Sequence, residues 1–193
     1  MCILDGENEA LMNGILSEKG IAFPIFLIGF MGSGKSTLGS WLAARLNVDF
    51  VDLDWLVEAC EGMPIPLIFA QRGEEAFRVA ERRALLDFCQ QGRRVVVSTG
   101  GGAPCYRDNL LHMQRAGTTV YLQLAAEELA TRLRGVQAER PLLAGVLPEA
   151  LAGHVGTMLA AREPYYSQAD LVVEAGVGGI PDIGEQVLRL LLG

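Results

Sequence analysis

Lysine and positive charge are scarce in this sequence. Of the 16 basic residues among 193, only Lys19 and Lys35 are lysines, and 23 acidic residues bring the formal net charge to −7. A chain with this excess of negative charge is not attracted non-specifically to nucleic acid or to anionic membranes. We therefore expect neither as a partner, and any phosphate that the protein binds must be held by a local group of cationic residues.

Cysteine pairs and long apolar runs are missing as well. The four cysteines are far apart with no C-x-x-C spacing, and two histidines are too few to complete a zinc site with them. We expect four reduced thiols. No apolar run reaches the roughly 18 residues of a membrane span, and the N-terminus lacks the basic and apolar regions of a signal peptide. These absences predict a cytoplasmic protein.

The composition that remains suits one globular domain. Half of the residues are hydrophobic, which at this length is enough to bury a single core. We expect that domain to span residues 23–193. Residues 1–22 mix acidic and apolar side chains and contain Gly20, so they predict a leader that is flexible or forms a short helix and carries no chemistry.

The most specific stretch is 29–36, GFMGSGKS, which matches G-x-x-x-x-G-K-[ST]. The apolar run 24–28 precedes it, and apolar residues at helical spacing follow it, so the sequence predicts a strand, a glycine-rich loop and a helix. Backbone N–H groups and the positive end of the helix then surround a polyphosphate. The alternative, a glycine-rich turn that binds nothing, does not account for this context. The predicted nucleotide-binding residues are Gly32, Ser33, Gly34, Lys35, Ser36 and Thr37.

Two side chains of this loop have separate predicted tasks. Lys35 would reach the β- and γ-phosphates of a nucleoside triphosphate, and the Ser36 hydroxyl would ligate Mg²⁺. An acidic pair follows the helix: residues 49–53 read as a short strand whose two-residue period places Asp52 and Asp54 on one side of its C-terminal end. Such carboxylates hold Mg²⁺-bound water or take a proton from an acceptor hydroxyl, whereas the plainer alternative is that Asp54 caps a helix.

Two helices are predicted next, one over 64–71 with Leu67 and Ile68 inward and one over 74–90, separated at Gly73. Glu81 falls on the apolar stripe of the second helix. A carboxylate facing a core must be paired, and Arg78, three residues earlier, is its nearest candidate. This pair would hold the Arg78 guanidinium ready for a ligand carboxylate; an exposed salt bridge is the alternative.

Glycines and arginines dominate the remaining candidates. The strand 94–99 leads into Gly100, Gly101 and Gly102, where the absence of side chains allows a ligand to approach the backbone. The segment 135–147 is predicted to be a hinged lid carrying Arg140, with Arg132 and Arg134 just before it; a solvated basic loop is the alternative. The helix that follows is predicted to end at Pro164, which would leave Arg162 in its last turn.

Strands and helices alternate throughout, so we expect an α/β fold with a doubly wound parallel sheet.

Together these segments resemble the shikimate kinase family over about residues 24–175. The match consists of GFMGSGKST, the DLD pair, GEEAFRVAE, TGGG, RPLLAG and AREPYY, in that order. The resemblance implies a three-layer P-loop kinase fold with a five-stranded parallel sheet ordered 2-3-1-4-5. It also implies transfer of the ATP γ-phosphoryl group to the 3-hydroxyl of shikimate. We expect a monomer that uses Mg²⁺ as cofactor and ATP as co-substrate.

The resemblance also assigns roles to the candidates. Asp54 is implied to bind the shikimate hydroxyls and act as base, Asp52 to lie near Mg²⁺, and Arg78 and Arg162 to grip the shikimate carboxylate. Gly101 is implied to contact a ring hydroxyl through its backbone, with Gly100 and Gly102 beside it. Arg140 corresponds to the lid arginine at the transferring phosphate, and the adenine-stacking arginine falls at Arg132 or Arg134. Two other functions stay open: a gluconate-type kinase, and a nucleotide-binding module without catalysis.

Overall fold

The computed structural model describes residues 21–135, 140–176 and 178–193. Nearly all of the predicted leader, and positions 136–139 of the predicted lid, lie outside these residues. Among the described helices none has the length and hydropathy needed to cross a bilayer. Cys60, Cys89 and Cys105 are free thiols, and Cys2 falls in the leader.

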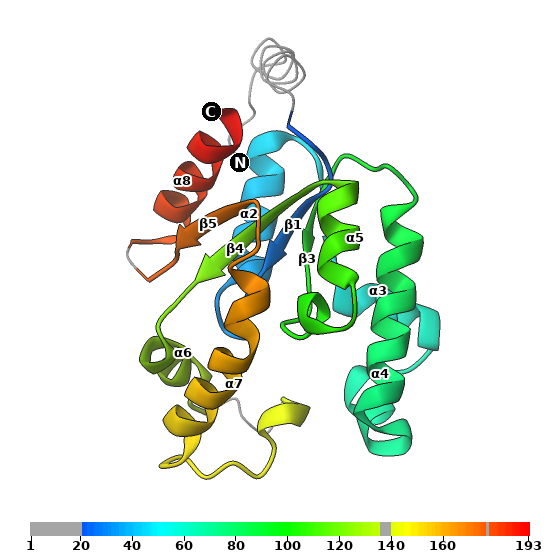
Figure 1. Cartoon of the computed structure of the whole chain (residues 1–193), viewed down its shortest axis with the longest axis vertical. Coiled ribbons are helices and arrows are strands. Elements are labelled where there is room, and N and C mark those ends of the chain that lie inside the picture. The colour runs from blue at the N-terminus through cyan, green and yellow to red at the C-terminus, as the bar shows by residue number, and fades with distance from the viewer. Residues whose placement is uncertain (1–20, 136–139, 177) are drawn as a thin grey trace.

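A five-stranded parallel sheet forms the centre of the domain (Figure 1). Its order is β2-β3-β1-β4-β5, as the family resemblance implied. All residues of β1 and β3 are buried, because a parallel sheet is covered by helices on both faces and its inner strands meet no solvent. The strands are β1 (Ile25–Ile28), β2 (Asp49–Asp52), β3 (Val95–Ser98), β4 (Thr118–Gln123) and β5 (Leu171–Glu174).

Helices cover both faces of this sheet. Figure 1 shows α5 in front of the sheet and α2 behind it, where α2 packs against α8 and the Trp41 ring lies directly on Gly184. The helices are α2 (Lys35–Leu46), α3 (Leu53–Glu61), α4 (Ile65–Cys89), α5 (Asn109–Ala116), α6 (Ala126–Leu133), α7 (Leu151–Tyr166) and α8 (Ile180–Leu192), with short 3₁₀ turns η1 (Ala103–Cys105) and η3 (Pro141–Leu143).

The predicted break at Gly73 is present as a kink inside α4. Gly73 has φ 80°, a left-handed conformation that divides the helix into two arms. The prediction that both Leu67 and Ile68 point inward is wrong, because Leu67 is 46% exposed while Ile68 is fully buried. Adjacent side chains on a helix diverge by about 100°, and the part of α4 before the kink is oriented so that Ile68 faces the core while Leu67 faces outward.

Two boundary predictions are also wrong. Helix α7 does not stop at Pro164 but continues to Tyr166, since a proline this close to the C-terminus removes only one backbone donor. Asp54 does not extend strand β2: the strand ends at Asp52, and Asp54 lies in the first turn of α3. The capping residue is Asp52, whose Oδ1 accepts from the Asp54 N–H at 3.1 Å.

Candidate functional site

The phosphate loop connects β1 to α2 at the carboxyl edge of the sheet. Gly34, the N-terminal cap of α2, has φ 93°, which a side chain would disfavour. The first turn of a helix leaves its N–H groups without intrahelical acceptors, so those of α2 face the loop. The Lys35 ammonium donates to the carbonyls of Gly29 (2.9 Å) and Phe30 (2.8 Å).

Burial makes the Lys35 ammonium more acidic than a lysine in water. Its side chain is almost wholly enclosed, and desolvation lowers the ammonium pKa to about 8, although Asp54 and Asp52 partly oppose the shift. A polyphosphate entering the loop would bring negative charge next to this nitrogen and favour its protonated form. The loop is therefore built to receive an anion at Lys35.

Ser36 and Asp52 meet beside the loop. The Ser36 hydroxyl donates to Asp52 Oδ2 at 2.7 Å and lies 3.2 Å from the Ser98 hydroxyl. These are hard oxygen donors of the kind that Mg²⁺ prefers, and the pair fits an ion that completes its shell with phosphates and water. No group of three or more His, Cys, Asp or Glu side chains that could hold a metal ion is found among the described residues.

Asp54 is a half-buried residue with one fully buried carboxylate oxygen. Its Oδ1 has no hydrogen-bond partner. Desolvation raises the pKa of this carboxyl above its ordinary value, and the neighbouring charge of Asp52 adds to the rise, while Lys35 and Arg140 oppose it. A carboxylate that is under-bonded and more basic than usual is equipped to accept a proton from a hydroxyl group.

Two cavities meet at Asp54. One, of about 270 Å³, is lined by the phosphate loop, Ser36 and Asp52; the other, of about 280 Å³, is lined by Arg78, Arg162 and apolar residues of α3 and α4. Both cavities share the residues Met31, Asp54, Gly100, Gly101 and Arg140. A phosphate in the first cavity and an acceptor in the second would thus meet at one set of side chains.

A larger cavity of about 580 Å³ between α6 and α7 has a different character. Glu128, Glu163 and Glu174 line it, and none of the predicted site residues does. Three carboxylates repel a phosphate, so its size does not make it the reaction site.

Arg78 is fixed as the sequence predicted. Its Nη1 donates to the fully buried Glu81 at 2.7 Å, and its Nη2 lies 3.1 Å from Glu74. Burial raises the pKa of Glu81 to about 7 against the opposing charge of Arg78. The exposed-salt-bridge alternative is excluded, because the Arg78 side chain is only 9% exposed.

Arg162 approaches the same cavity from α7. Its guanidinium lies 5.2 Å from the centre of the Phe30 ring, and its buried Nη1 has no hydrogen-bond partner. Buried polar side-chain atoms without partners are rare in native proteins. In the described part of the chain there are four, and all lie in or beside these two cavities: Ser33 Oγ, Asp54 Oδ1, Glu81 Oε1 and Arg162 Nη1.

The three consecutive glycines are each required by a close neighbour. A methyl group on Gly100 would lie 2.2 Å from Glu81 Oε1, and one on Gly102 would lie 2.5 Å from the centre of the Arg78 guanidinium. At Gly101 it would be 3.2 Å from the backbone nitrogen of Met31, in the phosphate loop. The loop thus fits between the two cavities because it has no side chains.

Arg140 of the predicted lid, and Arg132 and Arg134 just before it, lie in different places. Arg140 lines both cavities, as predicted. Arg132 lies over the phosphate loop, with Nη1 3.5 Å from the Gly32 carbonyl and Nη2 3.4 Å from the Ala175 carbonyl. Arg134 is exposed and lines neither cavity. Of the two candidates for the adenine contact, only Arg132 is therefore close to the nucleotide end of the loop.

Tyr166 is a contact that the sequence interpretation missed. It is fully buried, and its hydroxyl donates to the carbonyl of Gly101. The available signal was its spacing of four from Arg162 within AREPYY, which places both side chains on one face of a helix. Because the helix was expected to end at Pro164, Tyr166 was not placed on the same helix face as Arg162.

Comparison with known proteins gives one consistent result. The sequence model of the shikimate kinase family matches residues 31–190. A shikimate kinase from Parabacteroides distasonis is 40% identical over 171 residues, covering 86% of this chain and 98% of that protein. The structure of a shikimate kinase from Acinetobacter baumannii in complex with shikimate is 31% identical with a TM-score of 0.82, covering 92% of this chain and 97% of that one. A gluconokinase from Sinorhizobium meliloti shares the fold at 20% identity and a TM-score of 0.58, covering 89% of this chain and 92% of that one.

Proposed function

The chain belongs to the shikimate kinase family, and from this we propose how its site transfers the γ-phosphoryl group of ATP to the 3-hydroxyl of shikimate. The observation that carries the proposal is the set of unpartnered polar atoms where the two cavities meet. Asp54 Oδ1 and Arg162 Nη1 are both buried without hydrogen bonds. A hydroxyl donor and a carboxylate acceptor on one small molecule would satisfy both.

The shikimate carboxylate is assigned to two arginines. Arg78 is held rigid by Glu81 and Glu74, while Arg162 has a free donor. Two planar guanidinium groups bind a carboxylate with several charge-assisted hydrogen bonds. Because the acidic ligand lies between them, its ring is directed toward Asp54 and the glycine loop.

Asp54 then serves as the general base. The 3-hydroxyl oxygen forms a bond to the γ-phosphorus as the bond from that phosphorus to the β-bridging oxygen breaks, and the hydroxyl proton passes to Asp54. The raised pKa of this carboxyl makes it a better proton acceptor. The products are shikimate 3-phosphate and ADP.

Lys35 and Arg140 neutralise the phosphoryl group during transfer. Phosphoryl transfer requires mainly positioning and charge stabilisation from the protein. Both side chains line the phosphate cavity, and Arg140 also reaches the acceptor cavity. Arg132 is proposed to lie on the adenine, and Mg²⁺ is proposed to bind at Ser36 and Asp52, where it would supply positive charge to the β- and γ-phosphates.

The site is complete within one chain, so we propose that the protein acts as a monomer, and that it does so in the cytoplasm, where ATP is supplied. The gluconate-type alternative is not favoured, because the gluconokinase likeness extends to the fold alone. A module without catalysis is also not favoured, since Lys35, Asp54 and Arg140 line the same cavity.

The substrate assignment predicts a simple kinetic difference. Purified protein with ATP and Mg²⁺ should release ADP rapidly with shikimate and at the background rate with gluconate. A coupled assay of ADP, run with both acids at equal concentration, measures this. Equal release with and without shikimate would refute the proposed function.

The carboxylate clamp predicts a selective loss of shikimate affinity. Arg162→Ala removes a charge-assisted contact of about 1.5 to 3 kcal/mol, so shikimate should bind about 10- to 150-fold more weakly. ATP affinity without shikimate should stay as in the wild type. Arg162→Lys should restore little, because an ammonium lacks the planar fork. Calorimetric titrations with each ligand measure these effects.

Arg78→Ala should differ from Arg162→Ala in stability. Both should weaken shikimate binding, but loss of Arg78 leaves the buried Glu81 without its cation and should lower the Tm. Loss of Arg162 removes a donor that already lacks a partner. Equal weakening of both ligands by Arg162→Ala would show that its assignment is wrong.

A further inference from the structure

Tyr166 links α7 to the glycine loop of the acceptor cavity. Its ring is fully buried and lies 5.0 Å from the ring of Tyr121 on β4, tilted by 35°. Its hydroxyl donates to the carbonyl of Gly101, a residue that lines both cavities. The same helix carries Arg162 one turn earlier. One rigid element thus places a substrate arginine and an anchor for the loop that faces it.

A second set of hydrogen bonds fixes Glu163, which precedes Tyr166 by three residues in α7. The Tyr121 hydroxyl donates to Glu163 Oε2 at 2.7 Å, and Gln123 Nε2 donates to Glu163 Oε1 at 3.0 Å. These contacts tie the C-terminal end of α7 to β4, the end that lies against the sheet in Figure 1. Burial raises the pKa of both tyrosine hydroxyls, so each stays protonated and keeps its donor.

The Tyr166 hydrogen bond orients the loop backbone. The Gly101–Gly102 peptide is trans, so its N–H points opposite to the carbonyl that Tyr166 holds. Within the described residues, no acceptor is found for the N–H groups of Gly101 and Gly102. A loop between two cavities with unused backbone donors is arranged to donate to a ligand.

The position of this loop also limits where the side chains of Arg78 and Arg162 can lie. Gly102 packs on the Arg78 guanidinium, and a methyl group on Gly101 would lie 3.4 Å from Arg162 Nη1. Because these contacts are close, a small shift of the loop would displace the guanidinium groups of Arg78 and Arg162 or change the distance between them.

We propose that Tyr166 is a positioning residue for the acceptor substrate: its hydroxyl fixes the Gly101 carbonyl and thereby orients the Gly102 N–H, beside Arg78 and Arg162. This rests on the proposed function, because it assigns the acceptor cavity to shikimate. Tyr166 is assigned no contact with the substrate or the phosphates: its hydroxyl holds the Gly101 carbonyl and also interacts with the side chain of Arg162.

Tyr166→Phe tests the inference, since it deletes the hydroxyl and keeps the ring. The KM for shikimate should rise about 5- to 30-fold, the effect of leaving one buried acceptor without its partner. The KM for ATP and kcat at saturating shikimate should stay close to wild type. Calorimetry with shikimate alone should show the same loss of affinity.

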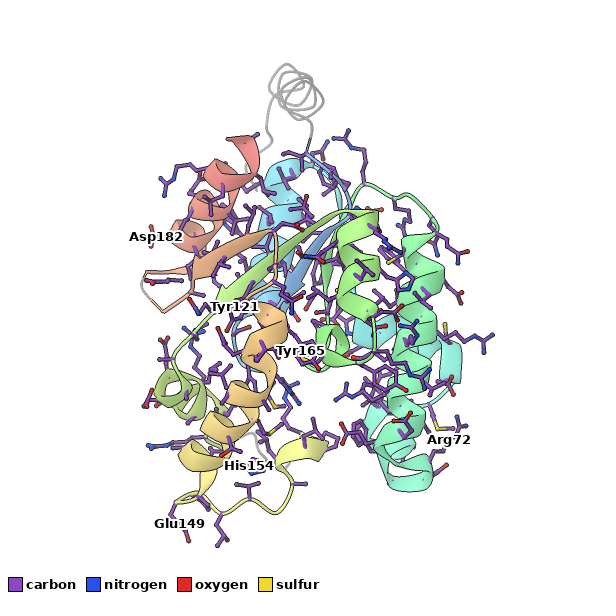
Figure 2. All side chains as sticks on the ribbon, viewed as in Figure 1. Arg72, Tyr121, Glu149, His154, Tyr165 and Asp182 are labelled. Carbon is purple, nitrogen blue, oxygen red and sulfur yellow. The ribbon has the colours of Figure 1, made fainter. Side chains whose placement is uncertain are left out.

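Tyr121→Phe is the matched control, because it deletes a buried tyrosine hydroxyl in the same cluster that does not touch the loop. It should lower the Tm to a similar extent and raise the KM for shikimate much less than Tyr166→Phe does. Tyr165→Phe, at the preceding and 38% exposed position (Figure 2), should change neither. If Tyr166→Phe lowers only the Tm, or raises both KM values equally, Tyr166 is merely structural and the inference fails.

A measurement on the wild-type protein covers the case in which Tyr166→Phe does not fold. With tyrosine labelled at the ring carbon that bears the hydroxyl, NMR should show the Tyr166 signal moving on addition of shikimate but not of ADP. The signal is assigned from Phe variants of the other three tyrosines. An unmoved signal at saturating shikimate would overturn the inference. Absence of shikimate turnover by the wild type would instead refute the proposed function.

Discussion

Lys35→Ala should lower kcat about 100- to 1,000-fold, the loss typical of removing one preorganised donor to a developing negative charge. Lys35 is the only lysine in the part of the chain that the structure describes, so no second ammonium can take its place. Burial lowers the pKa of its ammonium to about 8. The charge of ATP would draw the ammonium from the carbonyls of Gly29 and Phe30 toward the phosphates.

The fold should survive this change. The variant loses two hydrogen bonds to loop carbonyls, so we expect a Tm only a few degrees lower. Arg45→Ala is the matched control: it removes a cation from the same helix, where Arg45 pairs with Glu185 on α8 far from the loop. This control should keep wild-type turnover. A Lys35→Ala protein that is folded and has near wild-type kcat would contradict the role assigned to Lys35.

Asp54→Asn should lower kcat about 100- to 10,000-fold, because the amide has nearly the same shape but cannot accept the hydroxyl proton. Shikimate affinity should change much less than kcat. The Tm should not fall: the pKa of this carboxyl is raised in the folded state, so ionised Asp54 costs stability above its unfolded pKa, and the neutral amide avoids that cost.

The pH profile gives an independent test of the base. In the wild type, kcat should fall as the pH drops through the raised pKa of Asp54, because the protonated carboxyl cannot act as base. The variant should lack this limb. Glu58→Gln is the control, since it neutralises another carboxylate of α3 that lines the acceptor cavity. Equal losses in both variants would indicate a general effect of charge, and the assignment of Asp54 would be wrong.

The phosphate loop and the pairing of Arg78 with Glu81 were predictable because their determinants are local. A loop motif between a strand and a helix, and two side chains three residues apart on a helix, are defined by backbone periodicity alone. The strand order came from the family resemblance, because periodicity identifies strands but not their neighbours. The role of Asp52 as helix cap was hidden, since the strand and helix meet there with no turn between them.

By itself, the sequence determined that this chain binds a nucleotide and which residue types form its site. Only the tertiary structure placed Arg132, and not Arg134, over the phosphate loop, placed Asp54 at the junction of the two cavities, and brought Tyr166 to Gly101. These are contacts across 65 to 100 positions in the chain, and they depend on how far α7 extends and how α6 lies over the phosphate loop. Local propensity carries no information on such distances, because packing of the whole core fixes where each helix lies.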